Sequence, residues 1–166
     1  RELLHDPGDY LRQVEQRAAE QFGGKATLSL TDQLVDGKLV VQQGIIAGCA
    51  GGMYDNIAEA AAILSGGDVG CGPFSLSVYP PSIPVNLELM QNGVQQALLE
   101  AGVLFKPCFC GPCFGAGDVP ANNALSVRHT TRNFPNREGS KPGDGQLSGV
   151  LLMDARSIAA TARNHG

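Results

Sequence analysis

The sequence predicts an α/β fold, a three-layer α/β/α sandwich with a mainly parallel sheet. Short apolar segments rich in β-branched residues alternate with helical segments of ten or more residues. This alternation requires right-handed crossovers between parallel strands, with helices on the faces of the sheet. The 166 residues contain no internal repeat and begin with Arg1 rather than Met. We therefore expect residues 1–166 to form a single domain excised from a longer chain.

The first helix is predicted over residues 10–22. Asp6-Pro7 is a helix-start signal, the apolar residues that follow have helical spacing, and Gly23-Gly24 ends the helix. Residues 26–30 alternate between apolar and polar side chains, as a short strand does. The amino-terminal part of the chain therefore predicts one amphipathic helix and one strand.

The next elements surround a glycine-rich turn. Residues 38–47 are apolar and β-branched, which is typical of a buried strand. The segment Gly48–Gly52 reads as a tight turn, and the alanine-rich residues 54–64 predict a helix. Residues 74–79 then predict another strand, before Pro80-Pro81.

The second half of the chain repeats this order. A helical region is expected from 85 to 101, interrupted near Asn92-Gly93, because glycine weakens a helix interior. The remaining expected elements are strands over 103–106, 124–130 and 149–153, a helix over 155–164 and a polar surface loop over 138–146.

Composition and charge exclude several classes of protein. The formal net charge is -4 and no Lys/Arg cluster is present, so we expect no nucleic-acid partner. No apolar run approaches the ~20 residues that span a bilayer, so we expect no membrane partner. Five cysteines, an odd number with uneven spacing, do not form a secreted disulfide pattern. These observations favour a globular protein of the reducing cytoplasm.

The cysteines indicate a site at one edge of the sheet. Three of them lie within Cys108–Cys113 (CFCGPC), after a predicted strand, and Cys49 follows another predicted strand. In a parallel sheet, the carboxyl ends of strands meet at one edge, where ligands bind. For Cys71, between Gly70 and Gly72, we expect an ordinary buried cysteine.

Three chemistries suit these residues. CGPC is also the thioredoxin dithiol, but the segment after Cys113, Phe114–Pro120, is a poor helix and the chain contains no Trp. Four thiolates, from Cys49 and the three clustered cysteines, suit tetrahedral Zn²⁺. A third arrangement uses Cys49, Cys110 and Cys113 to hold an iron–sulfur cubane with one iron lacking a protein thiolate.

Four segments resemble those of a known family, in the same order and at similar intervals. They are Ile45–Cys49 with the Tyr54–Ile57 and alanine helix that follows, Cys110–Gly115 (CGPCFG), Thr131–Arg137 (TRNFPNR) and the strand and helix of Val150–Gly166. Together they resemble the third, cluster-bearing domain of the aconitase and isopropylmalate isomerase family. The resemblance covers the chain from about residue 40 to its end.

The resemblance implies a [4Fe-4S] cluster held by Cys49, Cys110 and Cys113. It also implies the reversible dehydration or hydration of a hydroxy di- or tricarboxylic acid, in which one iron acts as a Lewis acid. Arg132 and Arg137 match the family's substrate-binding arginines, and a guanidinium fork suits a carboxylate. The family's catalytic serine base and histidine–aspartate groups lie in other domains. We therefore expect no catalytic residue in this fragment, and activity only together with the remaining domains or a partner subunit.

Several residues depart from the family pattern. Ala50-Gly51 replace Thr-Asn after the first ligand, Thr131 replaces asparagine, Asn136 replaces glycine, and Cys108 has no usual counterpart. These changes surround the ligands, where neighbouring groups tune a metal site. They favour a divergent hydratase-like paralogue with an unassigned substrate. The alternative is a non-catalytic iron–sulfur or metal-binding module, for example one in which Cys108 supplies a fourth thiolate.

Three further polar residues lie near these segments. His129 is expected to be an ordinary histidine at a strand end, because the resemblance gives it no role. Asp55 and Asn56 begin the helix after Cys49, where they either cap the helix or help to order the site.

Overall fold

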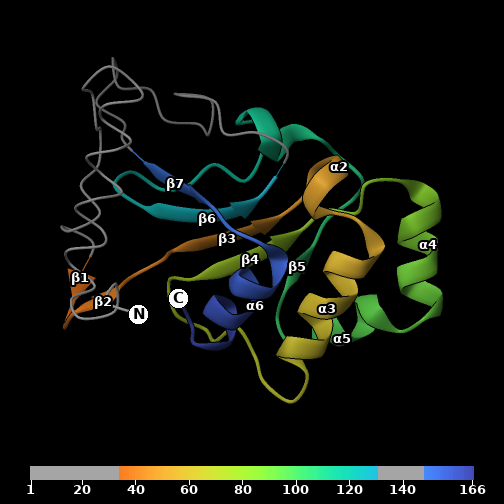
Figure 1. Ribbon diagram of the computed structural model, residues 1–166, viewed down its shortest axis with the longest axis horizontal. Helices are drawn as coiled ribbons and strands as arrows, with labels where there is room; N and C mark the ends of the chain where they lie inside the picture. The colour runs from red at the N-terminus through yellow and green to blue at the C-terminus, as the bar shows by residue number, and fades with distance from the viewer. Residues whose placement is uncertain (1–33, 131–147) are drawn as a thin grey trace, which may run out of the picture.

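The central feature of the protein is a five-stranded parallel sheet (Figure 1). A computed structural model describes residues 34–130 and 148–166. The strand order is β5-β4-β3-β6-β7, and every neighbouring pair is parallel. The strands are β3 (Gln43–Ile46), β4 (Ser75–Val78), β5 (Leu104–Phe105), β6 (Leu125–His129) and β7 (Gly149–Leu152). The predicted α/β class with a mainly parallel sheet is confirmed.

The long strand expected over residues 38–47 is two separate elements. Its first part, β2 (Lys38–Leu39), pairs antiparallel with β1 (Leu34–Val35), and only its last part is β3. Asp36 and Gly37 join β1 to β2 with φ angles of 51° and 74°. Positive φ at both residues is typical of a type I′ hairpin turn. Such a turn pairs β2 with the adjacent strand β1. The predicted helix over 10–22, strand over 26–30 and loop over 138–146 lie outside the described residues.

The helices follow the predicted positions closely. They are α2 (Gly48–Gly51), α3 (Tyr54–Leu64), α4 (Ile83–Gln91), α5 (Val94–Glu100) and α6 (Ala155–Arg163). The interruption expected near Asn92-Gly93 separates α4 from α5, and Gly93 has a φ of 74°. The expected turn after β3 is a single helical turn, α2. In residues 34–130 and 148–166, no helix has the length and apolar character needed to cross a membrane.

The main core lies between one face of the sheet and helices α3, α5 and α6. Helices α3 and α6 pack against each other, and α6 also contacts β3 and β6 (Figure 1). Gly44 of β3 permits this packing, because a Cβ there would lie 3.0 Å from the Ile158 and Leu76 side chains. The fully buried side chains of this core include Ile46, Ile57, Leu64, Leu76, Val78, Leu98, Leu125 and Ile158.

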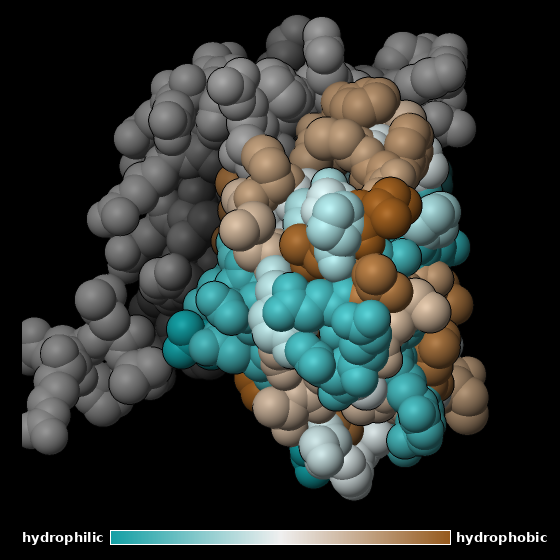
Figure 2. Space-filling model, turned by 90° about the vertical axis from the view of Figure 1, so that its right-hand side faces the viewer, coloured by the Kyte–Doolittle hydropathy of each residue, from teal (hydrophilic) through white to brown (hydrophobic). Residues whose placement is uncertain are grey.

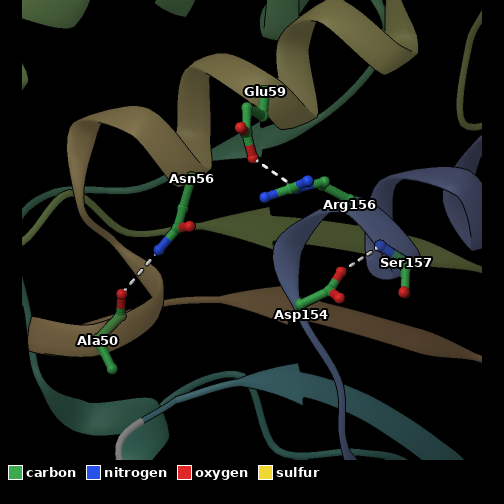
Figure 3. A network of polar contacts seen from close by, with 6 residues as sticks. All are labelled: Ala50, Asn56, Glu59, Asp154, Arg156 and Ser157. Carbon is green, nitrogen blue, oxygen red and sulfur yellow. Dashed lines mark hydrogen bonds and ion pairs between the residues drawn. The ribbon is translucent and has the colours of Figure 1, made fainter.

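Helix α6 begins at an aspartate cap. The Asp154 carboxylate accepts a hydrogen bond from the Ser157 backbone N–H at 2.7 Å (Figure 3). This contact satisfies a free amide of the first turn, and it lowers the pKa of Asp154 because the hydrogen bond favours the carboxylate. The cap fixes the point at which the chain leaves β7 and turns onto α3 and β3.

The opposite face of the sheet carries polar side chains. Leu125 and Val127 of β6 belong to the main core, so Ser126 and Arg128 project from the other face. Both are nevertheless buried, at 0% and 3% exposure, and Gln43 of β3 is 8% exposed. They form hydrogen bonds with residues 112 and 118, which follow β5. We call residues 107–119 the cysteine loop, and it covers this part of the sheet.

Candidate metal centre

Cys49 lies on a turn that packs against the ends of two strands, β4 and β6. Gly48, with a φ of 77°, turns the chain out of β3, and Cys49 follows it on α2 with an exposed side chain. A Cβ on Gly51 would lie 1.8 Å from the carbonyl oxygen of His129, at the end of β6. A Cβ on Gly52 would lie 2.4 Å from the carbonyl oxygen of Tyr79, after β4. The glycines therefore allow the turn that carries Cys49 to lie directly against the sheet.

The cysteine loop carries the other candidate ligands on a short 3₁₀ helix, η2 (Gly111–Phe114). The loop leaves β5 through Lys106, whose N–H donates to the Val78 carbonyl at 2.9 Å. At Gly111 a Cβ would lie 1.9 Å from the Phe109 ring and 2.3 Å from the Ala116 carbonyl oxygen, so only glycine fits. Gly115, with a φ of 80°, ends η2.

The short helix after Cys110 argues against a thioredoxin-type dithiol. That chemistry needs a helix N-terminus at the first cysteine to stabilise its thiolate. Here Cys110 precedes only one 3₁₀ turn, as expected from the poor helix signal after Cys113. None of the five cysteines forms a disulfide.

A buried hydrogen-bond network fixes the cysteine loop to the sheet. Arg128 Nη1 donates to the Pro112 carbonyl at 3.1 Å. Gln43 Nε2 donates to the Asp118 carbonyl at 3.0 Å, and Tyr79 Oη donates to the Asp118 carboxylate at 2.5 Å. Both halves of the loop are therefore held by side chains that the sheet supplies.

The two segments that carry the predicted ligands both contact β6 near its end. The pKa of the Cys110 thiol is raised, first by the charge of Cys113, then by burial, by a hydrogen bond with Cys113 and by the charge of Cys49. Cys49 therefore lies within electrostatic reach of Cys110, although 61 residues separate them in the sequence. Cys108 is only two residues away from Cys110 but is not among the groups that shift this pKa.

Cys71 differs from its expected environment. We predicted a buried cysteine, but its side chain is exposed. The neighbouring apolar residues Val69 and Phe74 are buried instead, at 4% and 5% exposure. Gly70, with a φ of 76°, turns the chain outward between them, so the short loop projects away from the core. Cys71 therefore makes a matched control for substitutions of the other cysteines.

The chemistry of the donor set is that of soft thiol ligands. In the part of the chain that the structure describes, no three His, Cys, Asp or Glu side chains are close enough to hold a single metal ion. In an iron–sulfur cluster the thiolates bind different irons, so they stand farther apart than the ligands of one Zn²⁺. A cationic metal group would favour the thiolate form of such ligands.

The predicted substrate-binding residues, Arg132 and Arg137, lie outside the described residues. Strand β6 precedes them in the sequence. At its end, the His129 carbonyl accepts a hydrogen bond from the Ala47 N–H at 3.0 Å. The end of β6 therefore adjoins the turn that carries Cys49. His129 lies at this strand end, as predicted, and within the described residues its buried Nδ1 has no hydrogen-bond partner.

Apolar side chains are exposed around the thiols. Met53 follows the Cys49 turn and is 51% exposed, while Phe109 and Phe114 of the cysteine loop are 50% and 48% exposed. Figure 2 views the side that carries α4, and its upper end, where α2 and the cysteine loop lie in Figure 1, is mostly apolar. The middle of the same side is largely hydrophilic (Figure 2). The thiols therefore lie in a weakly polar part of the surface.

Sequence reasoning missed the residues that hold the cysteine loop. Gln43, Ser126 and Arg128 are polar residues within strand segments, and Tyr79 and Asp118 flank the site. Polar residues at alternate strand positions, such as Ser126 and Arg128, usually face water. No signal within the strand marks Arg128 as buried, because its burial depends on the distant loop that covers it.

Comparisons with known proteins agree with the motifs. The sequence model of the Aconitase family (aconitate hydratase) matches residues 3–160. The 3-isopropylmalate dehydratase large subunit of Nitratidesulfovibrio vulgaris (strain DP4) is 33% identical over 125 residues, which are 72% of this chain and 29% of that protein. Large subunit 2 of the same enzyme from Pyrococcus furiosus is 34% identical over 129 residues, covering 75% of this chain and 32% of that protein.

The relatives also show how much of the whole protein this chain represents. A third relative, 3-isopropylmalate dehydratase large subunit 1 of Methanopyrus kandleri, is 33% identical over 121 residues and is matched over 29% of its length. The chain thus spans less than a third of each of these proteins. Because the family model matches almost its whole length, the chain belongs to the aconitase family.

Proposed function

We propose that this chain is the cluster-binding part of an aconitase-family hydro-lyase that acts on a hydroxy di- or tricarboxylic acid. Cys49, Cys110 and Cys113 would hold a [4Fe-4S] cluster. The observation that carries this proposal is that both candidate ligand segments contact the end of β6: the turn that carries Cys49 lies against the His129 carbonyl, and Arg128 donates to the Pro112 carbonyl between Cys110 and Cys113. Two separate segments thereby supply three soft ligands at the carboxyl edge of the sheet.

The chain's own residues would orient the ligands and the substrate. Iron without a protein thiolate is a Lewis acid, which makes a substrate hydroxyl a better leaving group. Gly51 and Gly52 let the turn that carries Cys49 lie against the ends of β6 and β4, and Gly111 lets the cysteine loop fold closely on itself. Arg132 and Arg137 would bind substrate carboxylates, because the guanidinium fork matches a carboxylate and keeps its charge.

The remaining chemistry is assigned to polypeptide outside this chain. The named relatives are large subunits of 3-isopropylmalate dehydratases, and this chain matches only 29–32% of their lengths. We propose that further domains of the parent chain, or a partner subunit, supply the groups that transfer protons. The departures at Ala50-Gly51 leave the particular acid unassigned. The thiolate chemistry suits the reducing cytoplasm.

Anaerobic reconstitution tests the cluster assignment. The reduced 166-residue chain is incubated with ferrous iron and sulfide, and bound iron, acid-labile sulfide and visible absorbance are measured. Cys49→Ser, Cys110→Ser and Cys113→Ser should each remove most of the iron and the absorbance, whereas Cys71→Ser should change neither. Full iron and sulfide content in Cys49→Ser would show that the three-ligand assignment is wrong.

A further inference from the structure

Arg128 occupies an unusual position for an arginine. It lies on β6, the strand next to β3, and only 3% of its surface is exposed. Arginine is almost never fully buried unless its charge and its donors are satisfied, because desolvation of the guanidinium is costly. Such a residue in the middle of a sheet face therefore requires a structural or functional reason.

The guanidinium is fixed by two neighbouring polar side chains. Arg128 Nε donates to Ser126 Oγ at 2.9 Å, and Nη2 donates to Gln43 Oε1 at 3.3 Å. Ser126 Oγ in turn donates to the same Gln43 oxygen at 2.7 Å. Because all three groups are buried, the orientation of the guanidinium is set by β3 and β6 and not by solvent.

A further bond of the guanidinium reaches the cysteine loop. Arg128 Nη1 donates to the carbonyl of Pro112, which lies between Cys110 and Cys113 in the sequence. A charge-assisted bond of this kind is stronger than a neutral one. Gln43 extends the same network to Asp118, at the far end of the cysteine loop. The guanidinium is therefore placed to fix the backbone that joins the two cysteines.

We propose that Arg128 is a positioning residue that holds the CGPC segment in the geometry required for ligation. Its role toward a cluster rests on the proposed function, but its hold on the loop does not, because the bonds exist in the metal-free chain. Its bond to the Pro112 carbonyl also places a positive charge against the segment that joins Cys110 and Cys113. Nearby charge and hydrogen bonds set the reduction potential of an iron–sulfur cluster, and a positive charge favours the reduced form.

Hydrogen exchange of the metal-free, reduced chain provides the first test. Arg128→Met keeps a similar volume but removes the charge and all donors. Exchange in residues 107–119 should rise about tenfold or more, as expected from losing a hydrogen bond to a charged group, while exchange in α3 stays unchanged. Arg163→Met is the control, because Arg163 donates to the carbonyls of Ile63 and Ser65, away from the thiols.

The result that overturns the proposal is defined for each variant. If folded Arg128→Met shows wild-type exchange in the cysteine loop, or an equal rise in α3, Arg128 does not position this loop. If Arg128→Met does not fold, Arg128→Lys is judged by the same criterion. Lysine retains the charge but lacks the planar fork that reaches three acceptors.

The reconstituted protein gives a second readout. Arg128→Met should release iron to a chelator faster than the wild type and should have a more negative reduction potential. Arg128→Lys should also release iron faster but keep a potential close to the wild type, because its charge remains. A wild-type potential in Arg128→Met would overturn the role of the charge. If no variant or wild type binds a cluster, the proposed function fails, while the exchange test of Arg128 still stands.

Discussion

Asn56 and Ala50 connect helix α3 to the turn that carries Cys49. The Asn56 side chain donates from Nδ2 to the Ala50 carbonyl at 2.8 Å (Figure 3). Ala50 directly follows Cys49, so the amide holds the turn from the side away from the sheet. Of the two roles considered for Asn56, this contact favours ordering of the site, because Met53 is the N-cap residue and no side-chain cap bond is present at α3.

Replacement of Asn56 should weaken the Cys49 turn. Asn56→Ala removes a partly buried hydrogen bond, which should lower the free energy of unfolding by about 1 kcal/mol and speed iron loss after reconstitution. Glu59→Gln on the same helix is the matched control, since the Glu59–Arg156 ion pair is largely exposed and worth roughly 0.5 kcal/mol or less (Figure 3). Urea unfolding and iron release measure both effects. Equal iron loss in the two variants would contradict a specific role for Asn56.

Gly51 should not tolerate a methyl group. Gly51→Ala places a Cβ 1.8 Å from the His129 carbonyl oxygen, so α2 must move away from β6. We expect a loss of about 1–3 kcal/mol in the free energy of unfolding, as for other overpacked sites, together with weaker iron binding. Gly72→Ala is the control, because a Cβ there has no atom within 4 Å. Wild-type stability in Gly51→Ala would show that the turn can shift at little cost.

Cys108 should be dispensable for cluster binding. The proposed ligand set is Cys49, Cys110 and Cys113, and it leaves Cys108 outside the cluster. Cys108→Ser should therefore retain the iron content of the wild type, whereas Cys110→Ser should lower metal affinity by about 100-fold or more, beyond the effect of losing a ligand's supporting contact.

Mössbauer spectra distinguish the catalytic proposal from its alternative. With three ligands, the spectrum of the reconstituted wild type should change when hydroxy di- or tricarboxylic acids are added. An unresponsive wild-type cluster that becomes responsive in Cys108→Ser would instead identify Cys108 as a fourth ligand. That outcome would favour the non-catalytic iron–sulfur module.

The Tyr79–Asp118 contact should make stability depend on alkaline pH. Burial, the hydrogen bond to Asp118 and the charge of Asp118 all raise the pKa of Tyr79. In the unfolded chain Tyr79 ionises near pH 10, as free tyrosine does, while the folded protein keeps the proton to higher pH. Above about pH 10 the unfolded state therefore binds fewer protons than the folded state. The stabilisation from the Tyr79–Asp118 contact is complete below about pH 10 and is lost as the pH rises above that value.

Substitutions at the pair check this sign. Tyr79→Phe should cost about 1 kcal/mol at pH 7 through the lost hydrogen bond, and its stability should fall less steeply than that of the wild type above about pH 10. The fall in stability of Asp118→Asn above about pH 10 should lie between those of the wild type and Tyr79→Phe, because the carboxylate charge is removed while the burial of Tyr79 remains. Parallel curves for wild type and Tyr79→Phe above pH 10 would contradict the assigned pKa direction.

Much of the fold was predictable because its signals are local. Helix α3 has the predicted bounds of residues 54–64, and the break between α4 and α5 lies at the predicted Asn92-Gly93. Alanine-rich segments favour helices and β-branched segments favour strands, and both preferences depend on residues that are close together in the sequence. The main error in the predicted bounds concerns the strand expected over 38–47. The positive φ angles at Asp36 and Gly37 form a turn that pairs β2 with β1 in a local hairpin.

By itself, the sequence determined the order of elements and the three candidate ligands, through motifs whose spacing is written along the chain. Only the tertiary structure decided that the Cys49 thiol lies within reach of Cys110, that Cys71 faces outward and that Arg128 is buried beneath the ligand loop. These features depend on which strand ends become neighbours in the sheet. A buried arginine and an exposed one have the same local sequence signal, because burial is decided by distant residues that fold over the site.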